Sequence, residues 1–118
     1  MKAFAPVLAL ALLALPPGAR ADVTTQEAAT AARMVSAHRA THGLSPVRVD
    51  AALNRAAAIQ SQAMAAQGVM SHDAAGAFPD RMRSTGVRSP AAENIGMGYH
   101  SLQHAFSGWQ ASHGHNVN

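Results

Sequence analysis

The chain has 118 residues, enough for one domain, and it contains no cysteine, which excludes disulfide cross-links and thiolate zinc sites. Nine basic residues stand against six acidic ones, and the basic residues form no cluster. Because aromatic residues are also scarce, at 4%, the composition gives no electrostatic footprint for nucleic acid, and we predict no nucleic-acid partner.

The amino terminus has the three parts of a secretory signal peptide. Met1-Lys2 is a short positive region, Ala3–Leu15 is an apolar run, and Ala19-Arg20-Ala21 places small residues before a cleavage site. The apolar run has 13 residues, fewer than the roughly 20 that a transmembrane helix needs, although an uncleaved anchor is the alternative. We predict a signal peptide over residues 1–21, a secreted or periplasmic location, and no stable membrane anchor after cleavage.

Residues 22–118 then form the single predicted domain. Loss of Lys2 and Arg20 with the signal peptide leaves seven arginines against six acidic residues, so the mature chain has a net charge of +1. A small domain without disulfides is held together by packing alone. Because alanine is abundant and large side chains are few, we expect modest stability.

Two long helices are predicted in the first half of this domain. Thr24 begins a capping box, in which a Glu follows three residues later, for a helix over Thr25–Thr41. Asp50 is a good N-cap for a second helix over Asp50–Gln67, which Gly68 is expected to end. The predicted core face of the second helix consists of Leu53, Ala56, Ala57, Gln60, Ala63 and Met64.

The second half of the domain is predicted to hold two shorter helices and little strand. The helices cover Pro79–Thr85, which Gly86 ends, and Ser101–Ala111. Val69–His72 is a candidate strand, and Arg88–Gly98 is expected to be a loop.

Three side chains are the best candidates for chemistry. His72 ends the candidate strand, Glu93 lies in the predicted loop, and His115 lies in the last turn of the chain. Two imidazoles and a carboxylate are able to bind Zn²⁺ with an open position, or to act as an acid/base pair. The histidines that we interpret as structural or solvated are His38, His42, His100 and His104.

Five segments follow one another in the order of a known set of motifs. Met34–Val47 is similar to an opening motif N-x-x-R…G-L-x-P-L, and Asp50–Ala57 is similar to a following D-x-x-L…A helix. Ser71-His72 resembles an S-H strand end, Ala92–Ile95 contains E-N-I, and Trp109–Asn118 matches W-x-x-S-x-x-H-x-x-N. Together they resemble bacterial domains of the CAP superfamily, also called the SCP or cysteine-rich secretory protein group.

This resemblance implies an α+β fold, the α-β-α sandwich of CAP domains. Domains of this family continue beyond the last motif with most strands of a central sheet. We therefore expect residues 22–118 to be an incomplete domain, mostly its helical part with most of the central sheet missing. Whether the chain is a fragment or a natural truncation is left open.

The resemblance also implies a binding cleft. Its residues here are His72, Glu93, Asn94, Ser112 and His115, and the candidate metal ligands are His72 and His115, with Zn²⁺ as the candidate ion. Many eukaryotic members have a glutamate where this chain has Ser112, and loss of that carboxylate weakens a catalytic interpretation.

The predicted function is a secreted, non-enzymatic CAP binding module with a His/Glu cleft for a divalent metal or a small apolar or lipid ligand. One alternative is a hydrolase that uses Ser112 or a metal-bound water. Another is an inactive fragment. The identity of the ligand and the oligomeric state are left open.

Cleavage after Ala21 is directly testable. Mass spectrometry of the exported protein should find Asp22 as the first residue, because Ala19 and Ala21 satisfy the signal peptidase. A mature protein that retains Lys2 and the apolar run would instead indicate a membrane anchor.

Overall fold

The computed structural model describes residues 7–10, 25–88 and 90–118. Within these residues, no helix is long and apolar enough to cross a membrane. The elements in chain order are β1 (Val7–Leu10), α1 (Thr25–Ala40), α2 (Ala51–Gln67), α3 (Phe78–Thr85), β2 (Ala91–Asn94), α4 (Leu102–Ala111) and α5 (His113–Asn116).

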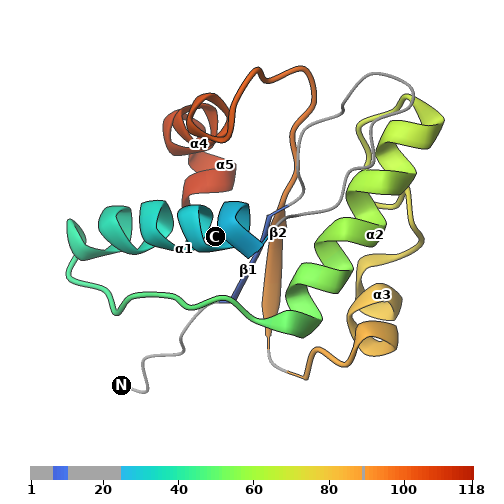
Figure 1. The fold of residues 1–118 in the computed structure, drawn as a ribbon, viewed down its shortest axis with the longest axis horizontal. Coiled ribbons are helices and arrows are strands. Elements are labelled where there is room, and N and C mark those ends of the chain that lie inside the picture. The colour runs from blue at the N-terminus through green and yellow to red at the C-terminus, as the bar shows by residue number, and fades with distance from the viewer. Residues whose placement is uncertain (1–6, 11–24, 89) are drawn as a thin grey trace.

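The two described strands lie between two groups of helices (Figure 1). β1 and β2 pair in parallel, with Val7 opposite Ala91 and Leu10 opposite Asn94. α2 and α3 lie on one side of the strands, and α1, α4 and α5 lie on the other. The described chain is therefore mostly helical around a small sheet, in agreement with the predicted helix-rich α+β class.

A first core cluster fixes α2 and α3 on their side of β2. Small side chains on α2 allow α3 to approach closely, since Ala56 and Ala57 are buried beside Leu53 and Met82. Ala91 of β2 packs against the same cluster. In a strand, alternate side chains share a face, so Glu93 also points towards α2 and α3.

A second cluster holds α1 and α4 on the opposite side. Trp109 of α4 is buried with Ala31 and Ala105, and its indole N–H donates to the carbonyl of Ile95 at 3.0 Å. Ile95 directly follows β2 and packs against Met64 of α2. The segment after β2 therefore links the two groups of helices.

The four predicted helices are confirmed to within one residue at each end. Oδ1 of Asp50 accepts from the N–H of Leu53 at 3.0 Å, and Gly68 ends α2 with a left-handed φ of 65°. The hydroxyl of Ser101 caps α4 by accepting from the N–H of His104 at 3.0 Å. Thr24, the first residue of the predicted capping box, lies outside the described residues.

Two sequence predictions of strand and loop are wrong. Val69–His72 is an irregular connection, and the carbonyl groups of Ser71 and His72 bind side chains of α2 and α3. Ala91–Asn94 lies in the predicted loop and is strand β2. Its sequence has no apolar alternation, and its partner strand is distant along the chain, so no local pattern marks it.

Four residues of the predicted signal peptide, Val7–Leu10, form β1 in this structure. The sequence predicts a targeting segment here and no strand. The rest of residues 1–21, with the cleavage site at Ala21, lies outside the described residues, so cleavage stays a prediction.

Removing the N-cap of α2 should destabilise the domain. We expect Asp50→Ala to lower the free energy of unfolding by about 1 kcal/mol, because the N–H of Leu53 loses its acceptor. For a domain of this size, that corresponds to a fall of about 4–8 °C in the melting temperature. Asp50→Asn keeps an acceptor and is the control; equal losses in both variants, measured by thermal denaturation, would contradict the capping role.

Candidate functional site

His72 and Glu93 form a hydrogen-bonded pair at the centre of the candidate site. His72 lies in the connection between α2 and α3, and Glu93 lies on β2. The Nδ1–H of His72 donates to Oε1 of Glu93 at 2.9 Å, since a carboxylate only accepts. The Glu93 side chain is 2% exposed and the His72 side chain is 55% exposed. With Nδ1 engaged by the carboxylate, Nε2 is the nitrogen that carries the lone pair of the neutral imidazole.

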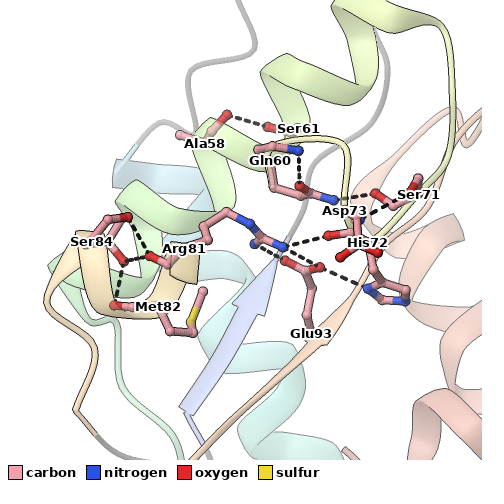
Figure 2. Close-up of polar contacts among 12 residues, drawn as sticks. Ala58, Gln60, Ser61, Ser71, His72, Asp73, Arg81, Met82, Ser84 and Glu93 are labelled. Carbon is pink, nitrogen blue, oxygen red and sulfur yellow. Dashed lines mark hydrogen bonds and ion pairs between the residues drawn. The ribbon is translucent and has the colours of Figure 1, made fainter. Parts of the chain in front are cut away.

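Arg81 of α3 is part of this site and was not predicted. Its guanidinium donates to both oxygens of Glu93, from Nη1 to Oε2 at 2.5 Å and from Nη2 to Oε1 at 3.1 Å. The same Nη2 donates to the carbonyl of His72 at 2.9 Å. Figure 2 shows the guanidinium reaching from α3 to both residues. The Arg81 side chain is 2% exposed, so this ion pair is buried.

A sequence signal for Arg81 does exist. Phe78, Arg81, Met82 and Thr85 have the i, i+3, i+4, i+7 spacing of one helix face, and the last three are buried. An arginine on an otherwise core-facing stripe indicates a buried acidic partner, because an unpaired charge is rarely buried. The neighbouring Asp80 and Arg83 pair with each other at the surface.

The buried Arg81–Glu93 pair is electrically balanced. Arg81 supplies one positive charge and Glu93 one negative charge, and the guanidinium also lies 5.4 Å from the centre of the Phe78 ring. Both carboxylate oxygens accept hydrogen bonds from within the protein. Glu93 is thus held as an acceptor that orients His72, and its oxygens are already engaged.

Asn94, Ser112 and His115 form a second group around α5. Nδ1 of His115 and Oγ of Ser112 share a hydrogen bond of 2.7 Å. Nδ2 of Asn94 donates to the carbonyl of His115 at 3.1 Å, and Oδ1 of Asn94 accepts from Nδ2 of Asn118 at 2.8 Å. Asn94 therefore anchors the last turn of the chain to the end of β2.

The predicted cleft residues thus fall into two groups that share β2. Glu93 and Asn94 are consecutive in the strand, so their side chains leave it in opposite directions. No hydrogen bond in the described part of the chain joins His72 to His115. Likewise, residues 7–10, 25–88 and 90–118 contain no set of three or more His, Cys, Asp or Glu side chains arranged to hold a metal ion.

The other histidines take no part in the hydrogen bonds that define these two groups. His38 of α1 is a structural link, because Nε2 of Gln110 donates to its Nδ1 at 3.0 Å and its own Nε2–H donates to Asn116 at 2.7 Å. The rings of His100 and His104 are stacked with centroids 6.1 Å apart, and both residues are exposed.

Substitutions of Arg81 and Glu93 should have strongly non-additive effects on the free energy of unfolding. We expect Arg81→Met and Glu93→Leu each to lower the free energy of unfolding by about 3–5 kcal/mol, because each leaves one buried charge without its partner. The double variant should lose much less than the sum of the two losses.

The exposed pair on the same helix is the matched control. Asp80→Ala and Arg83→Ala should each change stability by less than about 1 kcal/mol, because solvent screens that pair. Urea unfolding of all variants measures these differences. Additive losses for Arg81→Met and Glu93→Leu would contradict the coupling.

Comparison of the sequence with known families finds one match. The sequence model of "CAP: Cysteine-rich secretory protein family" matches residues 32–118, which include all five motif segments and both groups of candidate residues. Comparisons with curated proteins and with solved structures find no match. Since the match covers most of the chain, this protein belongs to the CAP, or cysteine-rich secretory protein, family, although it contains no cysteine.

Proposed function

We propose that this protein is a secreted or periplasmic, non-enzymatic CAP-domain binding module that binds a divalent metal ion such as Zn²⁺ through His72. The observation that carries the proposal is the 2.9 Å hydrogen bond from Nδ1 of His72 to Glu93. Metal-binding histidines commonly donate their second ring N–H to a carboxylate, which fixes the tautomer and raises the basicity of the free nitrogen. Here Nε2 of the half-exposed imidazole is that free nitrogen.

Glu93 supports the metal without binding it. Its oxygens already accept three hydrogen bonds, from His72 and from the two guanidinium nitrogens of Arg81. These contacts favour a role for Glu93 as a residue that orients His72, and not as a metal ligand. The proposed site therefore has imidazole donors and an open coordination sphere for water or a ligand atom.

His115 is the proposed second ligand. When the Nδ1–H of His115 donates to Oγ of Ser112, its Nε2 carries the lone pair and is able to bind a metal. A site with two imidazoles has few protein ligands for Zn²⁺, which usually takes three or four. We therefore expect weak binding.

Calorimetric titration with Zn²⁺ tests the proposal. His72→Ala and His115→Ala should each weaken binding by at least about tenfold, because each removes an imidazole ligand. Affinity should also fall as the pH is lowered, since protonated imidazole does not bind metal. His100→Ala, an exposed histidine outside the site, is the control and should leave the affinity unchanged.

Equal zinc uptake by the wild type and by both site variants would overturn this site. It would assign the bound metal to histidines elsewhere in the chain, for which His100→Ala then gives a first test. No uptake by the wild-type protein would overturn metal binding altogether.

A second candidate function is a serine-type hydrolase, which the 2.7 Å contact between Ser112 and His115 favours. An imidazole close to a hydroxyl is able to accept its proton during nucleophilic attack. A fluorophosphonate probe should then label Ser112 in the wild type and not label His115→Ala. Against this function, Ser112 immediately precedes α5, and its partner is Nδ1 of a histidine only three residues later.

A small apolar or lipid ligand, implied by the family resemblance, is a separate proposal. The side chains of Val69 and Met70, which precede His72 in the chain, are exposed and offer an apolar ligand a contact surface. Binding of a fluorescent fatty acid that Met70→Gln weakens would support it, and unchanged binding by this variant would contradict that surface.

A further inference from the structure

Gln60 is a polar residue on the core face of α2. Gln60 is fully buried, with 0% exposure, and the neighbouring buried positions of α2 are the apolar residues Ala56, Ala57 and Met64. A buried amide is unfavourable unless both its donor and its acceptor are satisfied. The partners of Gln60 therefore show what this position does.

Both ends of the Gln60 amide bind the backbone of the turn that carries His72. Nε2 of Gln60 donates to the carbonyl of Ser71 at 2.5 Å, and Oε1 accepts from the N–H of Ala75 at 3.1 Å. The two backbone groups flank His72 in the sequence. One side chain thus holds the turn on both sides of the candidate ligand.

Arg81 holds the same turn at a third point. Its Nη2 donates to the carbonyl of His72 itself at 2.9 Å. Figure 2 shows Gln60 and Arg81 approaching the turn from α2 and α3 respectively, with Glu93 beyond the guanidinium. The backbone of His72 is therefore fixed from two helices, which sets the direction from which its imidazole meets Glu93.

We infer that Gln60 is a positioning residue for His72, an inference that rests on the proposed metal-binding role of His72. A neutral amide is required, because an ionised glutamate does not donate to the carbonyl of Ser71 and a methionine offers neither a donor nor a strong acceptor. Gln60 acts only through the backbone of residues 71–75. By holding this backbone, Gln60 increases the fraction of molecules in which Nδ1 of His72 points at the carboxylate of Glu93.

The experiment compares two glutamines that bind the same turn. Gln60→Met removes the buried amide, whereas Gln67→Met removes an exposed amide that donates to the carbonyl of Ala74 at 2.8 Å. Imidazole ¹⁵N resonances, recorded on the metal-free protein, report the tautomer of each histidine. Zinc affinity is measured on the same samples by calorimetry.

We expect Gln60→Met to convert His72 from one tautomer to a mixture, without changing the resonances of His38. Zinc affinity should fall by about 10- to 100-fold, as for other residues that orient a metal ligand. Gln67→Met should alter neither quantity. A folded Gln60→Met protein with wild-type His72 resonances would overturn the inference.

A measurement on the wild-type protein covers the case in which Gln60→Met does not fold. The amide of Ala75, held by Oε1 of Gln60, should exchange with solvent at least about tenfold more slowly than an unprotected turn amide. Unprotected exchange at Ala75 would overturn the inference. The ¹⁵N resonances are recorded without metal, so they test the role of Gln60 independently of zinc binding. A wild-type protein that binds no zinc would refute the proposed function. The role of Gln60 would then still be tested by the tautomer of His72.

Discussion

The buried ion pair between Arg81 and Glu93 is the interaction on which the candidate site depends. A carboxylate and a guanidinium, each 2% exposed, are stable inside a domain only when each compensates the other. The pair joins α3 to β2, and through Nη2 it also reaches the backbone of His72. The same contacts that make burial of these charges tolerable therefore place the imidazole beside the carboxylate.

The small core gives this arrangement its frame. Alanines on α2 let α3 approach β2, so that Arg81 reaches Glu93 from the same side as Ala91. On the other side of β2, Asn94 binds the carbonyl of His115 and thereby holds α5. A four-residue strand thus carries two neighbouring polar residues, each of which anchors a different histidine-bearing segment.

Local signals in the sequence were sufficient for α1 to α4, but not for the short helix α5 or for the contacts between the helices. Asp50 and Ser101 act as the caps that their positions predict, because capping involves residues only three apart. Strand β2 was missed because Ala91–Asn94 has neither alternation nor β-branched residues, and its pairing depends on a distant segment. Glu93 and His72 were predicted as neighbours from the family motifs; their spacing of 21 residues alone does not bring them together. Arg81 was missed although its helix face marks it, and Gln60 was placed on the core face without its contacts to the turn.

The tautomer of His72 tests the central claim most directly. Long-range ¹⁵N–¹H correlation spectra of the metal-free wild-type protein, recorded on the neutral form of the imidazole, distinguish the two ring nitrogens. A buried carboxylate that accepts from Nδ1 predicts a single tautomer of His72, with the proton on Nδ1 and the lone pair on Nε2. A proton on Nε2, or an even mixture of the two tautomers, would contradict the proposed orientation of His72 and remove the basis for metal binding at this site.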